Sequence, residues 1–211
     1  MGIFQFDSKF NRFMTQLLNL LLLCILFPLG CLPVVTIGVS AIAAYTVLLK
    51  IVLDGDEDVS VIATFCKAYR QNLKHGVLLT LLAGALLYSA WISWQLFEAA
   101  PGNPMPFLIA AMAMVFAVAL HLLYVLPLEA RYRNSLWTAL RNARLIAVQY
   151  AKHTLVLVLL LALEFALFFM VNSTLVLLGY LIGPVCFMLT VSTVAGAVFR
   201  QLEHPAPGGD E

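Results

Sequence analysis

The chain has 211 residues, of which 63% are hydrophobic and 11% charged, and its mean hydropathy is +0.97. Soluble domains are usually nearer half apolar and a quarter charged. This composition excludes a water-soluble single domain, a disordered chain and a nucleic-acid-binding protein that works through a basic surface. Six spans of roughly 20 residues each would take about 120 residues and leave about 90 for other segments.

Two apolar runs open the chain. Residues 1–16 carry phenylalanines at helical spacing and predict a short interfacial helix. Residues 17–32 and 34–53 follow as two expected spans. The prolines and glycine between Pro28 and Pro33 break the run, because proline lacks an amide donor and glycine loosens a helix. We expect a hairpin with a tight extracytoplasmic turn.

An acidic loop at 54–58 leads into the next segment, residues 59–75, which has the spacing of an amphipathic helix. Its expected apolar stripe is Ile62, Phe65, Cys66, Tyr69 and Leu73, and its basic side chains are Lys67, Arg70 and Lys74. Spans at about 76–97 and 107–128 follow. The loop between them is rich in proline and is also expected to be extracytoplasmic.

A second basic amphipathic helix is predicted at 135–153, with Arg141, Arg144 and Lys152 among its cations. The last two spans are expected at about 154–171 and 174–199, and Gly183-Pro184 interrupts the second of them. Residues 1–199 thus form one membrane domain, and residues 200–211 form a polar cytoplasmic tail.

The positive charges predict the orientation. With six spans and both termini in the cytoplasm, all twelve Lys and Arg residues fall on the cytoplasmic side, as the positive-inside rule requires. The expected fold is all-α: a polytopic membrane protein with six transmembrane helices in three hairpins, each preceded by an amphipathic basic segment. Lys74-His75 and Lys152-His153 recur at two of these junctions. Either an internal duplication or the charge bias alone explains the recurrence.

Two segments resemble a known family. Cys31-Leu32-Pro33-Val34-Val35-Thr36-Ile37-Gly38 resembles the LP-x-VTIG segment of YesL-like bacterial integral membrane proteins, and residues 65–74 (FCKAYRQNLK) resemble their F-x-x-A-[FY]-R-x-N-[FL]-K helix. Val39-Ser40 departs from the proline or alanine common soon after that glycine. The resemblance implies a multi-pass protein of the bacterial cytoplasmic membrane, of unassigned molecular function and linked by genome context to carbohydrate uptake or breakdown. It supplies no catalytic residues.

Two ionisable residues fall well inside predicted spans, where charge is costly and often functional. Glu164 lies in the fifth span and His121 in the fourth, at depths that differ by about 5 Å at 1.5 Å per residue. One interpretation is a pair that holds or passes a proton. The other is a structural tie between helices, with Glu164 bonded to a nearby polar side chain.

The two basic helices also allow two interpretations. They could lie on the anionic inner leaflet of the lipid bilayer, or they could dock a cytoplasmic partner within a membrane transport complex. The candidate docking residues are Lys67, Arg70, Lys74, Arg141, Arg144 and Lys152. The sequence predicts no particular oligomeric state.

No catalytic motif, metal site or cofactor is predicted. The acidic run beginning at Asp54 has the spacing of a calcium loop, but its twelfth position is Phe65 and not glutamate. We therefore expect a non-enzymatic multi-pass protein, an accessory or regulatory component associated with carbohydrate uptake. The alternative is a small solute transporter or channel with a polar centre at Glu164 and His121.

Overall fold

The computed structural model describes residues 8–55, 59–100, 102, 104–132, 135–170, 176 and 179–203, apart from the side chains of residues 8–12 and His121. Every element in the described part of the chain is helical, and six helices are long and apolar enough to cross a membrane. The prediction of an all-α polytopic membrane protein is therefore confirmed.

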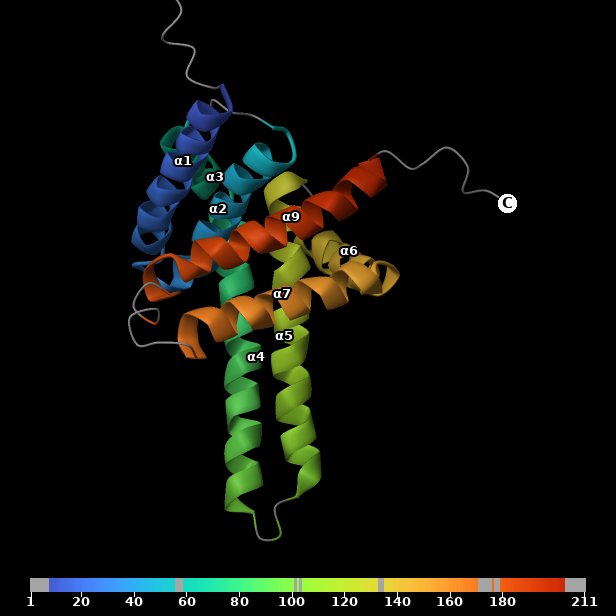
Figure 1. The fold of residues 1–211 in the computed structure, drawn as a ribbon. Helices are drawn as coiled ribbons and strands as arrows, with labels where there is room; N and C mark the ends of the chain where they lie inside the picture. The colour runs from blue at the N-terminus through green and yellow to red at the C-terminus, as the bar shows by residue number, and fades with distance from the viewer. Residues whose placement is uncertain are drawn as a thin grey trace, which may run out of the picture.

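The elements follow the expected order along the chain (Figure 1): α1 (Ser8–Gly30), the 3-10 turn η1 (Val34–Thr36), α2 (Ile37–Val52), α3 (Val61–Gln71), α4 (Leu73–Ala99), α5 (Met105–Arg131), α6 (Leu136–Gln149), α7 (Ala151–Met170) and α9 (Gly183–Glu203). Both basic segments are shorter than predicted, because the long helices α4 and α7 begin almost directly after them. The interruption expected at Gly183-Pro184 is the start of α9, where proline fits because a first-turn amide needs no helical acceptor. Much of 174–182 lies outside the described residues.

Helices α4 and α5 form a long antiparallel hairpin that projects beyond the other helices (Figure 1). Its surface is apolar, with exposed leucines, phenylalanines and tryptophans along most of its length. From Lys74 to Trp94 the helix rises about 30 Å, which matches the hydrocarbon thickness of a bilayer. Trp91 and Trp94 are exposed near the far end, where tryptophan usually marks the membrane interface. Each helix of this hairpin is therefore long enough to cross a membrane.

The turn between α1 and α2 lies beside the start of α4, far from the tip of the hairpin. The Gly38 amide donates to Thr80 Oγ1 at 2.9 Å, and the Tyr69 hydroxyl donates to the Gly30 carbonyl at 3.2 Å. These contacts fix the turn to the α3–α4 junction, so it lies well short of the tip of the α4–α5 hairpin. The expectation that the turn and the loop near Glu98 share one side of the membrane stays a prediction.

Two glycines allow this arrangement, because α2 crosses α4 with its backbone in contact. A Cβ atom on Gly38 would lie 2.6 Å from the Gly76 carbonyl oxygen, and one on Gly76 would lie 2.6 Å from the Val39 backbone. Thr36 fixes the preceding turn, since its hydroxyl lies 2.9 Å from the Gly30 carbonyl and 2.7 Å from the Pro33 carbonyl. Any side chain at either glycine would separate the two helices.

Helix α2 is the centre of the fold. It contacts α1, α3, α4, α5 and α9, and most of its side chains are buried. Helix α3 packs on α1 and α2 through Val61, Phe65 and Ala68. The expected stripe was therefore partly wrong: Ile62 and Cys66 are exposed, because the buried face is rotated toward Val61 and Ala68.

The last helices surround α5. Helix α6 packs mainly on α5 through Ala139, Ala143 and Ile146. Helices α7 and α9 contact each other and run across the hairpin, not alongside it (Figure 1). The hydroxyls of Tyr124 and Thr154 lie 2.9 Å apart and join the fully buried Tyr124 to the start of α7.

The glycine crossing yields a stability prediction. Gly76→Ala should lower the free energy of unfolding by about 1–3 kcal/mol, the usual cost of adding a methyl group to a closely packed site. The measurement is thermal unfolding of the purified protein in detergent. Gly84→Ala is the matched control on the same helix, because nothing lies within 4 Å of its Cβ position. Equal stability of the two variants would contradict the prediction.

Candidate functional site

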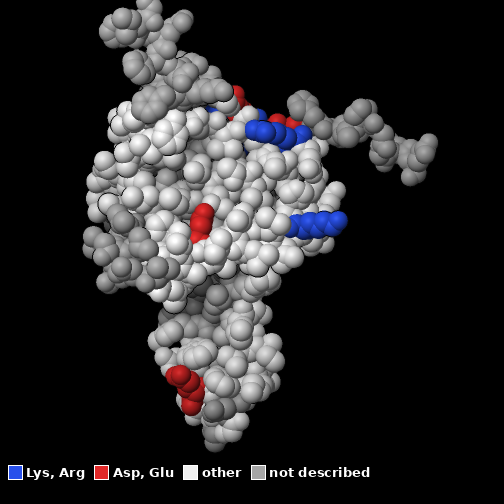
Figure 2. Space-filling view, in the orientation of Figure 1, with Lys and Arg blue, Asp and Glu red and all other residues white. Residues whose placement is uncertain are grey.

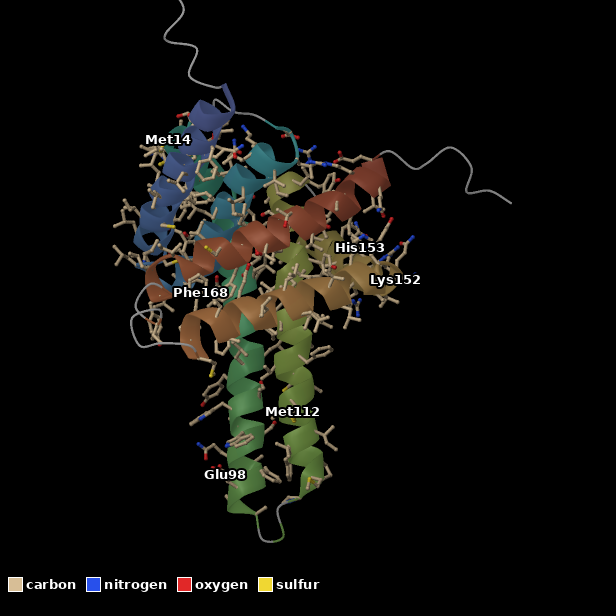
Figure 3. The ribbon with its side chains drawn as sticks, in the orientation of Figure 1. Met14, Glu98, Met112, Lys152, His153 and Phe168 are labelled. Carbon is tan, nitrogen blue, oxygen red and sulfur yellow. The ribbon has the colours of Figure 1, made fainter. Side chains whose placement is uncertain are left out.

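Charged side chains of the described residues gather at the end of the fold opposite the hairpin tip. We call this the charged end; it contains Asp54, His75, Glu129, Arg131 and Glu203. The projecting part of the molecule is white in Figure 2 apart from an acidic side chain near its tip, where Figure 3 labels Glu98. The polar interactions that could form a site are therefore at the charged end.

An ion-pair network closes the outer part of the charged end. Arg131 donates from Nη1 to Asp54 at 2.7 Å and from Nε to Glu203 at 3.3 Å. The Tyr132 hydroxyl donates to the same Glu203 at 2.7 Å. Burial and the neighbouring Glu203 carboxylate raise the pKa of Tyr132 to about 12, so the phenol keeps its proton at neutral pH. The network joins the end of α9 to α5 and to the loop after α2.

A second pair, between a histidine and a carboxylate, lies near this network and joins α4 to α5. His75 Nδ1 and Glu129 Oε2 are 2.9 Å apart, and they join the first turn of α4 to the last turns of α5. The Glu129 side chain is only 2% exposed, whereas that of His75 is 43% exposed. Because a carboxylate accepts from Nδ1–H, Nε2 remains the free ring nitrogen of His75. Glu129 Oε1 is buried and has no partner among the described residues.

A polar cavity of about 660 Å³ opens beside this pair. Its lining comes from the α3–α4 junction and from the end of α5: Thr46, Ala68, Arg70, Gln71, Asn72, Leu73, Lys74, His75, Glu129, Ala130, Arg131 and Tyr132. Arg131 is already held by two carboxylates. Arg70 and Lys74 are exposed and belong to the second of the two segments that carry the family resemblance.

The first turn of α4 also borders the cavity. Asn72 precedes the helix, but its side chain turns back and donates to the Ala68 carbonyl at 2.9 Å, so it does not cap the amides ahead of it. The unsatisfied amides at a helix start carry a partial positive charge. Of the cavity lining, Arg70 and Lys74 are exposed cations, and the carboxylate of Glu129 lies behind His75.

The structure separates the six predicted docking cations into two groups. Arg70 and Lys74 line the polar cavity, and Lys67 is exposed on α3 outside its lining. The other three lie on α6 and at the start of α7, and Figure 3 labels Lys152 there, across the molecule from α1. The two basic helices therefore do not form one surface.

Helix α6 differs from α3 in what accompanies its cations. Arg141 and Arg144 share the exposed face with Trp137 and Val148, which are 77% and 78% exposed. Arg144 and Trp137 also border an apolar groove of about 210 Å³ between α6 and the hairpin. A mixture of cations, tryptophan and exposed aliphatic side chains is typical of a helix at the lipid interface.

Of the predicted Glu164–His121 pair, the structure describes only the side chain of Glu164. Glu164 is half-buried, and its Oε1 accepts a hydrogen bond from the Thr190 hydroxyl, which joins α7 to α9. Its Oε2 is buried and has no partner among the described residues. The side chain of His121 lies outside them, so its pairing with Glu164 stays a prediction.

Sequence reasoning missed the central residues of the cavity. Neither His75 nor Glu129 belongs to a catalytic or metal-binding motif, and Glu129 lies near a helix end, from which a carboxylate can reach water. The carboxylate of Glu129 is instead buried against His75, because α4 and α5 pair along their full length. The only sequence signal was the recurring Lys-His pair, and its second copy behaves differently: the ring of His153 contacts that of Tyr150.

This difference supports a prediction. His75→Ala should destabilise the protein by about 1–3 kcal/mol, because it leaves the buried Glu129 carboxylate without its partner. His153→Ala is the matched control and should have a smaller effect. Thermal unfolding in detergent measures both, and adding Glu129→Leu to His75→Ala should recover part of the loss. Equal effects at the two histidines would rule out a special role for the His75–Glu129 pair.

The comparisons with known proteins agree with the position of the motifs. The family described as "Protein of unknown function, DUF624" matches residues 16–94, which include both segments of the resemblance and run from α1 into α4. No curated protein and no solved structure matches the chain. The resemblance is thus confirmed over residues 16–94 at the level of this family of unknown function.

Proposed function

We propose that this protein is a non-enzymatic accessory or regulatory component of the bacterial cytoplasmic membrane, associated with carbohydrate uptake, and that it docks a cytoplasmic partner through α3. The link to carbohydrate uptake comes from the YesL-like resemblance alone. The partner would be a component of a membrane transport complex. In this orientation both termini and the charged end face the cytoplasm, in accord with the positive-inside rule.

The packing of α3 is the observation that carries the docking proposal. A helix that rests on a membrane buries its apolar face in lipid. Helix α3 instead uses that face against α1 and α2, where Val61, Phe65 and Ala68 are at most 5% exposed. Lys67 and Arg70 are left on the exposed face. A basic surface held rigidly by the protein favours a protein partner, whereas the tryptophan-bearing face of α6 favours lipid.

Capture of the native complex tests the docking proposal. The tagged protein is extracted from its native membrane in mild detergent, and proteins that co-purify are identified by mass spectrometry. Replacing Lys67, Arg70 and Lys74 by glutamate should remove a specific partner. Replacing Arg141, Arg144 and Lys152 in the same way reverses an equal charge on the other basic group and should leave the partner bound. A partner lost equally in both variants, or retained in both, would contradict docking through α3.

The second candidate function is a small transporter or channel centred on Glu164 and His121. It is favoured by one observation, the buried Glu164 Oε2 without a partner among the described residues. Its rival is a structural tie to Thr190, which a glutamine could also make.

Glu164→Gln separates these two roles. In proteoliposomes with a pH-sensitive dye and a panel of sugars, a proton carrier should lose proton-coupled uptake on this substitution. A structural tie should survive with little change in thermal stability. If wild-type protein alone moves no solute and no proton, the transporter role is wrong.

A further inference from the structure

The cavity at the α3–α4 junction shares Arg70 and Lys74 with the proposed docking surface, but it also has a wall from the end of α5, which the docking proposal does not use. Its volume, about 660 Å³, lies within the range of small-molecule binding sites. Arg70 and Lys74 line it, and no ion pair of either is found among the described residues. Two exposed cations, neither of which has an ion pair in the described part of the chain, therefore border the cavity.

We propose that this cavity binds a phosphate ester. Arg70 can hold two phosphate oxygens with its planar guanidinium, and Lys74 adds a second charge from the first turn of α4. The inference does not depend on the proposed partner.

His75 provides the third contact. Glu129 holds Nδ1 at 2.9 Å, which fixes the ring and leaves Nε2 for a ligand. Glu129 itself is too deeply buried to meet a ligand, since its side chain is 2% exposed. It therefore acts on the phosphate only through His75.

Arg131 has a different task. Its guanidinium is engaged by Asp54 and Glu203, so it closes the outer rim of the cavity and is not free to bind the ligand. Tyr132 is likewise engaged by Glu203. The free cations thus lie on the α3–α4 side of the cavity, and the α5 side supplies the rim.

The phosphate could belong to a soluble metabolite or to a lipid headgroup. Lys74 begins the stretch of α4 that matches the bilayer thickness, which sets the cavity at the depth of headgroup phosphates. Both sources present the same group to Arg70 and Lys74. The cavity volume exceeds the needs of one phosphate and leaves room for the attached alcohol.

The test measures phosphate binding by full-length protein in a neutral detergent. Glycerol 3-phosphate, titrated at constant ionic strength, should bind wild type and raise its melting temperature above that in sodium chloride. Arg70→Gln and Lys74→Gln should each raise Kd about fivefold or more, as expected for loss of a charge-assisted hydrogen bond. Lys67→Gln removes an equal charge from α3 outside the cavity lining and should change Kd less than about twofold.

A second arm identifies the source of the phosphate. Native mass spectrometry of protein from phosphatidylglycerol nanodiscs should show retained lipid that is lost in Arg70→Gln and Lys74→Gln if the ligand is a headgroup. Binding of glycerol 3-phosphate with the same variant pattern, without retained lipid, identifies a soluble ester. The proposal is overturned if neither arm separates these variants from Lys67→Gln. Partner capture that fails while phosphate binding follows this pattern would refute the docking role alone.

Discussion

At the crossing of α2 and α4 the backbone of Gly38 lies against that of Gly76, and the Gly38 amide donates to Thr80 at 2.9 Å. This contact brings the turn before α2 to the start of α4, so that turn lies well short of the tip of the α4–α5 hairpin. It also brings the two family-like segments together, since Tyr69 in one donates to Gly30 beside the other. The motif residues thus specify a junction between helices, which explains why small and polar residues recur among hydrophobic ones.

The same junction positions the polar cavity. Helix α3 is held against α1 and α2, and α4 begins after a single intervening residue, so Arg70 and Lys74 take fixed places at the cavity edge. The opposite wall comes from the end of α5, which reaches the junction because α4 and α5 are equally long. The His75–Glu129 pair joins these walls where the hairpin leaves the rest of the fold.

Hydropathy and charge were sufficient to predict the number and order of the long helices, because span length follows from bilayer thickness and polar or proline-rich segments separate the apolar runs. They were insufficient for the packing. Periodicity within 59–75 placed Ile62 on the buried stripe, but the partners of α3 bury Val61 and Ala68. The partner of Glu129 was equally hidden, since His75 is 54 residues away in sequence and meets it only through helix pairing. Arg70 and Lys74 could be predicted as exposed cations, because the amphipathic pattern of neighbouring residues is enough to place them on the polar face of the helix.

The position of the cavity connects its occupancy to the membrane hairpin. Its walls belong to α4 and α5, and the direct polar contact between them there is the His75–Glu129 pair. A ligand that held Arg70 on α3 and Lys74 on α4 would stabilise the junction between these two helices, next to the His75–Glu129 pair that joins α4 to α5. Differential stabilisation of this kind is what a regulatory ligand requires. Because the α3 surface and the cavity share Arg70, occupancy of the cavity would also affect the surface proposed to dock a partner.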